Sequence, residues 1–120
     1  MKKRILVVED QEDARRILRD LLTKAGFDLI EAENGKEAVA SAQANRPDLI
    51  LMDIQLPLLD GYEATRRIKA DPDLKSIPII VVTSYALSGD EEKARLAGGD
   101  DYVAKPFSPR QLLAKIKEYV

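Results

Sequence analysis

Three acidic residues stand at the ends of apolar segments of the chain. Glu9 and Asp10 follow residues 4–8, and Asp53 ends the run of residues 49–53. The chain contains no Cys and no His, which excludes disulfides, thiol catalysis, imidazole metal sites and Ser-His-Asp triads. Carboxylates, hydroxyls and lysines are therefore the groups with which this sequence can do chemistry.

Carboxylates that share one crevice repel each other strongly. At a separation of about 4 Å in a medium of intermediate dielectric, two of them repel by roughly 4 kcal/mol, so a cluster must take up protons or a cation. Oxygen ligands favour a hard divalent ion, and few carboxylates with room for water and a phosphate favour Mg²⁺. We therefore expect Glu9, Asp10 and Asp53 to hold Mg²⁺. The simpler alternatives are that Glu9 and Asp10 cap a helix, and that Asp53 only ends a strand or caps a turn.

Two further side chains complete the parts of a phosphoryl-transfer site. Thr83 ends the apolar segment 77–83 and offers a hydroxyl, and Lys105 follows residues 102–104 with an ammonium group. Each of them alone is common, because strands often end in Thr and a single Lys is usually a solvated surface charge. Together with a metal and a carboxylate nucleophile, they are what the acceptance of a phosphoryl group on Asp53 requires.

An alternation of strands and helices would position these residues. Apolar runs predict strands at residues 4–8, 27–32, 49–53, 77–83 and 102–104. Helical spacing predicts a first helix from Ala14, Ile17, Leu18, Leu21, Leu22 and Ala25, with Gly26 as its stop. Capping patterns predict the starts of four more helices, at Asn34 with Glu37, Asp60 with Glu63, Ser88 with Glu91 and Ser108 with Gln111.

Five strands that are each followed by a helix predict a three-layer α/β sandwich around a parallel sheet. The first, third and fourth strands are the most apolar and should lie in the middle, with the second and fifth outside. This is the flavodoxin-like strand order 2-1-3-4-5, whose ligand site lies at the switch point between the first and third strands. The topology therefore brings Glu9 and Asp10 next to Asp53.

Composition limits the other functions that the chain can have. At 120 residues, with 45% hydrophobic and 33% charged residues, the sequence predicts one globular domain over residues 1–120. A net charge of -2 gives no electrostatic reason to bind nucleic acid or an anionic membrane. The chain has no apolar run long enough to cross a membrane and no secretory segment after Met1, so we expect it in the cytoplasm.

The whole chain resembles a known family, the CheY-like receiver domains of two-component response regulators. The resemblance lies in Val7-Val8-Glu9-Asp10, in residues 51–57 with Asp60-Gly61, in Val82-Thr83-Ser84 and in residues 102–107. Its layout is most similar to the DivK type of stand-alone regulator. The resemblance implies the CheY-like fold and a protein that is phosphorylated on an aspartate in a phosphorelay.

The resemblance also implies a role for each matching residue. Asp53 would be the phosphoacceptor, and Glu9 and Asp10 would be the acidic pair that holds Mg²⁺, together with the backbone carbonyl of Gln55. Thr83 would be the hydroxyl switch, Lys105 the lysine that pairs with the phosphate, and Tyr102 the aromatic residue that turns inward on activation. By the same resemblance, the Lys105-Pro106 peptide bond would be cis.

The resemblance also implies the partners. A sensor histidine kinase or a histidine phosphotransfer protein would supply the phosphohistidine, because this chain has no His. Phosphorylation would change the affinity of the face formed by the fourth helix, fifth strand and fifth helix for an unknown downstream protein. The alternative output is a phosphate shuttle or sink that passes the phosphoryl group to another phosphotransfer protein. In either case the chain would catalyse only its own phosphorylation and dephosphorylation.

Three other functions are alternatives to phosphorylation on Asp53. A flavodoxin-like cofactor binder needs a phosphate-binding loop after the first strand, where the acidic residues 9–13 would repel a bare phosphate. An aspartyl-phosphate phosphatase would need a second Asp two residues after the nucleophile, and this chain has Gln55 there. A receiver-shaped scaffold that no kinase phosphorylates usually lacks one of the site residues, and this sequence has all of them.

Overall fold

The computed structural model describes residues 2–83 and 90–120, in which five parallel strands alternate with five helices. The elements are β1 (Arg4–Val8), α1 (Glu12–Lys24), β2 (Asp28–Ala32), α2 (Gly35–Asn45), β3 (Leu49–Asp53), α3 (Gly61–Ala70), β4 (Ile79–Thr83), α4 (Asp90–Leu96), β5 (Asp101–Ala104) and α5 (Pro109–Tyr119). The strands pair in the order β2-β1-β3-β4-β5, all parallel. This confirms the predicted flavodoxin-like sandwich and its strand order.

Three helices, α2, α3 and α5, begin at the capping residues that the sequence predicted. The side chains of Asn34, Asp60 and Ser108 each accept a hydrogen bond from the backbone N–H three residues further on, at 2.8, 2.9 and 3.0 Å. Caps of this kind stabilise a helix by about 1 kcal/mol each. The predicted cap at Ser88 lies outside the described residues, as does Ser84.

No helix of the described chain combines the length and the apolar character that a membrane span needs.

β5 begins at Asp101, one residue before the predicted strand, and two other strand boundaries differ from the prediction for local reasons. β4 begins at Ile79 instead of Ile77, because the Ile77 N–H donates to the carbonyl of Leu74 and thereby belongs to the preceding turn. β2 begins one residue late, because the Phe27 N–H donates to the carbonyl of Leu22 at the end of α1. Neither shift moves the carboxyl end of its strand.

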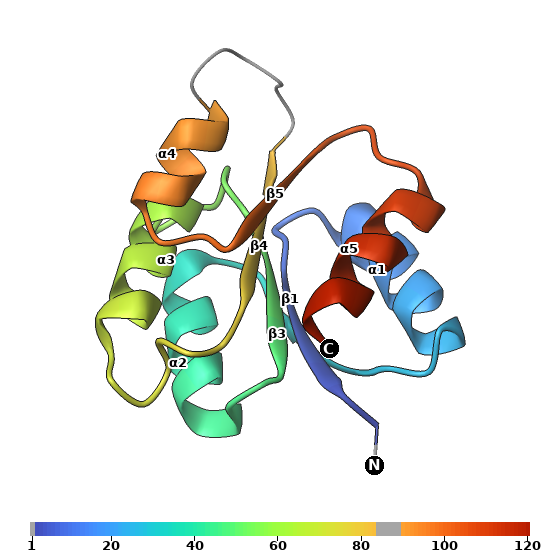
Figure 1. The fold of residues 1–120 in the computed structure, drawn as a ribbon, viewed down its shortest axis with the longest axis horizontal. Coiled ribbons are helices and arrows are strands. Elements are labelled where there is room, and N and C mark those ends of the chain that lie inside the picture. Colours follow the sequence, from blue (N-terminus) through green and yellow to red (C-terminus); the bar gives the residue numbers. More distant parts are fainter. Residues whose placement is uncertain (1, 84–89) are drawn as a thin grey trace.

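Helices cover both faces of the sheet, with α2, α3 and α4 on one side and α1 and α5 on the other (Figure 1). Alternate residues of each central strand point to opposite faces, so each strand contributes to two cores. One core contains Leu6, Ile50, Met52, Ile79 and Val81 with residues of α2, α3 and α4, and the other contains Ile5, Val7, Leu49, Leu51 and Ile80 with residues of α1 and α5. Every residue of β3 and β4 is buried, as their continuous apolar sequences predicted.

The inward face of α1 includes a charged residue that the apolar spacing did not indicate. Ile17 is 68% exposed, whereas the charged residue Arg15 is buried together with Leu18 and Leu22. Arg15, Leu18 and Leu22 are three and four residues apart, which is the spacing of one helical face. The prediction of a helix was therefore right, but Ile17, one of the residues that indicated it, does not face the core.

A glycine at the start of α3 allows the chain to turn back closely against β3. A β-carbon on Gly61 would overlap the backbone carbonyl oxygen of Asp53. The Gly61 N–H donates to the carbonyl of Ile54 at 2.9 Å, which closes the loop between β3 and α3. This close approach fixes the backbone from which the Asp53 side chain extends.

Candidate functional site

The carboxyl ends of β1 and β3 bring the three predicted acidic residues together. The two strands are neighbours with Val8 opposite Met52, so the residues that follow them meet at one edge of the sheet. Carboxylate oxygens of Glu9, Asp10 and Asp53 lie within 4.8 Å of one another. The sequence prediction that these side chains converge is thus correct.

The protein partly withdraws this acidic cluster from water. Glu9 is only 2% exposed and Asp53 only 5%, while Asp10 remains accessible to solvent. Burial raises the pKa of the Asp10 carboxyl, and the hydrogen bond to Glu9 and the charge of Glu9 raise it further. The cluster therefore has the mutual repulsion that we expected from the sequence.

The simpler explanations for the acidic residues account for little of this geometry. The residue at the N-cap position of α1 is Gln11, so neither Glu9 nor Asp10 is the N-cap residue, although Oε2 of Glu9 accepts a hydrogen bond from the Gln11 backbone N–H at 3.1 Å. A carboxylate oxygen of Asp53 does accept a hydrogen bond from the backbone N–H of Gln55, at 3.1 Å. Asp53 thus stabilises the turn after β3 with Oδ1, and its Oδ2 contacts Lys105 instead.

Lys105 supplies a positive charge at the centre of the acidic cluster. Its Nζ lies 2.7 Å from Oε1 of Glu9 and 3.2 Å from Oδ2 of Asp53. Burial alone would lower the pKa of Lys105, but the Glu9 and Asp53 carboxylates together raise it above its ordinary value. The ammonium is therefore charged at neutral pH. The peptide bond between Lys105 and Pro106 is cis, as the family resemblance implied.

The remaining predicted residues lie at the end of β4, on β5 and in the loop after β3. Thr83 is 3% exposed at the carboxyl end of β4, and its carbonyl accepts a hydrogen bond from the Lys105 backbone N–H. Tyr102 is half-buried on β5 and packs against the core under α2, α3 and α4. Gln55 is exposed in the loop after Asp53. The roles of the Thr83 hydroxyl, the Tyr102 ring and the Gln55 carbonyl stay predictions.

The donor set of this edge fits a hard cation. Three carboxylates, two of them buried, could hold a metal ion between them, and no softer ligand is present because the chain has no Cys or His. A divalent ion would relieve the repulsion among the carboxylates more fully than Lys105, which pairs with only two of them. Oxygen ligands with solvent access on the Asp10 side match the preference of Mg²⁺, which keeps several waters when bound.

Sequence reasoning missed Arg15, a buried residue on α1 that contacts the acidic segment. Its Nη1 donates to the carbonyl oxygen of Glu9 at 2.8 Å and to that of Asp10 at 3.3 Å. One signal in the sequence could have identified it. Arg15 lies three residues before Leu18 and seven before Leu22, so it shares the helical face of those two buried leucines.

An open groove of about 470 Å³ begins at the same edge of the sheet. Glu9 and Lys105 form its polar end, and its walls are mostly apolar, with contributions from Ala14, Ile17, Leu18, Pro106 and Phe107. The exposed side chain of Ile17 lies in this groove. The acidic cluster is therefore reachable from solvent beside α1.

Comparisons with known proteins agree with one another over almost the whole chain. Residues 5–117 match the family model of the response regulator receiver domain. The chain is similar to the polar-differentiation response regulator DivK of Brucella anthropi, with 44% identity over 120 residues that cover 100% of this chain and 98% of the relative.

Solved structures show the same likeness. The receiver domain of the sensor histidine kinase PA1611 from Pseudomonas aeruginosa, which has a magnesium ion coordinated in its active site cleft, superposes with a TM-score of 0.93 at 39% identity, covering 99% of this chain and 98% of that one. The chemotaxis protein CheY4 of Vibrio cholerae superposes with a TM-score of 0.93 at 27% identity, covering 100% of both chains.

Proposed function

Because the chain belongs to the response regulator receiver domains, which act in two-component signalling, we propose that Asp53 is the residue that accepts the phosphoryl group. One observation carries this assignment. The Asp53 carboxylate is buried at the sheet edge, among two other carboxylates and 3.2 Å from the Lys105 ammonium. The two carboxylate oxygens of Asp53 thus lie beside a positive charge and beside ligands for a cation, as a phosphoryl acceptor requires.

The proposed reaction transfers the phosphoryl group between two side chains. A carboxylate oxygen of Asp53 attacks the phosphorus of a phosphohistidine, the phosphorus–nitrogen bond breaks, and the imidazole nitrogen keeps the electron pair. The phosphohistidine belongs to a sensor histidine kinase or a histidine phosphotransfer protein, because this chain has no His. The groove beside Lys105 offers the donor a route to the site. Catalysis is confined to the protein's own phosphorylation and dephosphorylation.

Each residue of the edge has a proposed part in this step. Glu9, Asp10, Asp53 and the backbone carbonyl of Gln55 would hold Mg²⁺. When bound, Mg²⁺ supplies positive charge that offsets the charge on the phosphoryl oxygens. The Lys105 ammonium, already beside Asp53, pairs with a further phosphoryl oxygen.

The proposed output is a change in affinity for another protein. The Thr83 hydroxyl would donate to the new phosphoryl group, and Tyr102 would turn inward, biasing two arrangements of the face formed by α4, β5 and α5. Both residues lie on adjacent strands, with Val81 opposite Tyr102 and Thr83 opposite Ala104. The second candidate output, relay of the phosphoryl group to another phosphotransfer protein, needs no such movement.

The remaining parts of the proposal concern the whole chain. We propose that residues 1–120 form one receiver domain. Its partners are proteins, and it binds neither nucleic acid nor membrane directly. A cytoplasmic location stays a prediction from the sequence. A scaffold that is never phosphorylated is the less favoured alternative, because Glu9, Asp10, Asp53 and Lys105 are all present: the three carboxylates lie within 4.8 Å of one another, and Lys105 pairs with Glu9 and Asp53.

Replacing Asp53 with Asn tests the assignment directly. The wild-type protein, incubated with acetyl phosphate and Mg²⁺, should gain the mass of one phosphoryl group, and the Asp53→Asn variant should gain none because an amide is not a nucleophile here. Asp20→Asn is the matched control, since it removes an exposed carboxylate of α1. Phosphorylation of Asp53→Asn at the wild-type level would rule out Asp53 as the acceptor. Intact-protein mass spectrometry gives the readout.

A further inference from the structure

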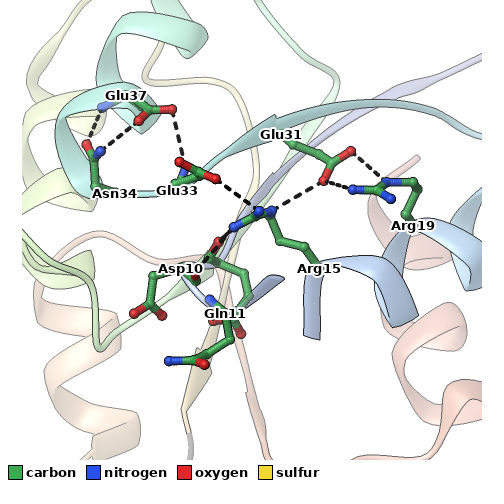
Figure 2. A network of polar contacts seen from close by, with 9 residues as sticks. Asp10, Gln11, Arg15, Arg19, Glu31, Glu33, Asn34 and Glu37 are labelled. Carbon is green, nitrogen blue, oxygen red and sulfur yellow. Dashed lines mark hydrogen bonds and ion pairs between the residues drawn. The ribbon is translucent and has the colours of Figure 1, made fainter. Parts of the chain in front are cut away.

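Arg15 is a buried cation that the proposed phosphoryl transfer does not use. Its side chain is 9% exposed, and Nη1 donates to the backbone carbonyls of Glu9 and Asp10. Its other nitrogens face acidic residues at the end of β2. Nη2 lies 3.0 Å from Glu33 Oε1, and Nε lies 3.4 Å from Glu31 Oε1. Arg15 therefore joins α1, the end of β2 and the acidic segment after β1 (Figure 2).

The two carbonyls that Arg15 holds belong to two of the proposed metal ligands. Glu9 and Asp10 are consecutive, so hydrogen bonds to both carbonyls fix the backbone dihedral angles between them. Those angles in turn set the directions in which the Glu9 and Asp10 carboxylates leave the chain. A guanidinium suits this task, because it presents several N–H donors in one rigid plane.

The charge of Arg15 is balanced on the side away from the acidic cluster. Figure 2 shows Glu31 and Glu33 on one side of the guanidinium and Asp10 and Gln11 on the other. Glu31 is itself fixed by Arg19, whose Nε and Nη2 each donate to it at 2.8 Å. This hydrogen bond to Arg19 is one cause of the lowered pKa of Glu31, which keeps that carboxylate ionised. Arg15 can thus hold the acidic segment through its backbone while its charge is matched elsewhere.

We infer that Arg15 is a positioning residue for the metal site: its guanidinium clamps the Glu9 and Asp10 carbonyls so that the two carboxylates are aligned for Mg²⁺. This inference rests on the proposed function. The inference predicts a change in Mg²⁺ affinity whose direction distinguishes positioning by Arg15 from a purely electrostatic effect. If Arg15 acted only through its charge, removing it would make the site more negative, and Mg²⁺ would bind more tightly. If Arg15 acts as a clamp, removing it weakens Mg²⁺ binding.

The test is the dissociation constant for Mg²⁺, measured by isothermal titration calorimetry on the full chain. Arg15→Met keeps much of the aliphatic packing and removes the donors, and it should bind Mg²⁺ about ten- to a hundredfold more weakly, as is typical for residues that orient metal ligands. Arg16→Met is the matched control. It removes the same charge from the next residue, whose side chain is 59% exposed and pairs with Asp13. Mg²⁺ affinity of this variant should be unchanged or slightly tighter.

Arg15→Lys separates the geometry of the donors from the charge. A lysine keeps the charge but not the planar fork, so its affinity for Mg²⁺ should lie between those of the wild-type protein and Arg15→Met. The free energy of unfolding without Mg²⁺, measured for all variants, separates positioning from a purely structural role. A variant that loses stability but binds Mg²⁺ normally would show that Arg15 only holds the fold together.

Each outcome decides the matter. The inference is overturned if Arg15→Met binds Mg²⁺ as tightly as the wild-type protein or more tightly, or if Arg15→Met and Arg16→Met change by the same factor. If Arg15→Met does not fold, Arg15→Lys carries the test, and a wild-type dissociation constant in that variant overturns the inference. A wild-type chain that binds no Mg²⁺ would instead overturn the proposed function, and the inference with it.

Discussion

The carboxylates at the acidic edge of the sheet repel one another, and one lysine offsets this repulsion only in part. Glu9 and Asp53 are nearly inaccessible to water, and each has the Lys105 ammonium as a partner. Asp10 is left out of these ion pairs, and its pKa is raised first by burial and then by the hydrogen bond and charge of Glu9. Unfavourable charge that persists in a folded protein commonly marks a functional site. We propose that this edge accommodates a cation and a phosphoryl group.

Replacing Lys105 should therefore change stability and metal binding in opposite directions. Lys105→Met leaves two buried carboxylates without their ammonium, so we expect the free energy of unfolding without Mg²⁺ to fall by about 1.5–3 kcal/mol. The same change makes the site more negative, so Mg²⁺ should bind more tightly and recover a larger share of stability than in the wild-type protein. Urea unfolding with and without Mg²⁺ measures both effects.

A second lysine provides the control for that experiment. Lys115 on α5 pairs with Asp101 at 3.0 Å, at the opposite end of β5 from Lys105. Lys115→Met should lose some stability and leave the Mg²⁺ dissociation constant unchanged. A Lys105→Met protein whose Mg²⁺ affinity falls with its stability would contradict the electrostatic account of the cluster.

At the scale of elements, α5 is tied to β5 at the end far from the acidic cluster. The Tyr119 hydroxyl lies 3.1 Å both from the carbonyl oxygen of Asp100 and from Oδ2 of Asp101. Burial raises the pKa of Tyr119 to about 12, and the hydrogen bond and charge of Asp101 contribute to the same shift. The side chain is nevertheless 36% exposed, so solvent screens much of this interaction. The Tyr119 contact should therefore make a small contribution to the free energy of unfolding, and this contribution should depend on pH.

The direction of this pH dependence follows from the raised pKa. Tyr119 contributes its full stability below its ordinary pKa of 10.0, and it loses that contribution as the pH rises towards about 12. Tyr119→Phe removes the hydroxyl and should cost at most about 1 kcal/mol at neutral pH. The difference between the two proteins should then shrink between pH 10 and about 12, as measured by chemical denaturation. Parallel stability curves over this range would show that ionisation of the Tyr119 hydroxyl does not affect the free energy of unfolding.

Local sequence was enough to predict most of the elements, because their signals are short-ranged. The caps at Asn34, Asp60 and Ser108 depend on contacts three residues apart, and the buried strands β3 and β4 show as continuous apolar runs. The buried face of α1 was harder, because Arg15 takes a core position and the apolar Ile17 does not. A charged residue can be buried when an acidic partner lies beside it, and the partner Glu33 comes from the distant loop between β2 and α2.

At the scale of the whole molecule, strand order assembles the site from distant parts of the chain. Glu9 and Lys105 are 96 residues apart in sequence and form an ion pair because β1, β3, β4 and β5 end at the same edge. The sequence supported this convergence through the alternation of strands and helices and the family resemblance. It could not predict that Lys105 lies closer to Glu9 than to Asp53, since that depends on the loop after β5 and on side-chain packing.

A crystal structure with Mg²⁺ and beryllofluoride, a mimic of the phosphoryl group, tests the central claim most directly. We expect Mg²⁺ beside Asp10 and Asp53, beryllofluoride on a carboxylate oxygen of Asp53, and the Lys105 ammonium in contact with the fluoride. An Asp53 carboxylate without beryllofluoride, in crystals where Mg²⁺ and beryllofluoride are bound elsewhere or not at all, would contradict the claim that this sheet edge accepts a phosphoryl group.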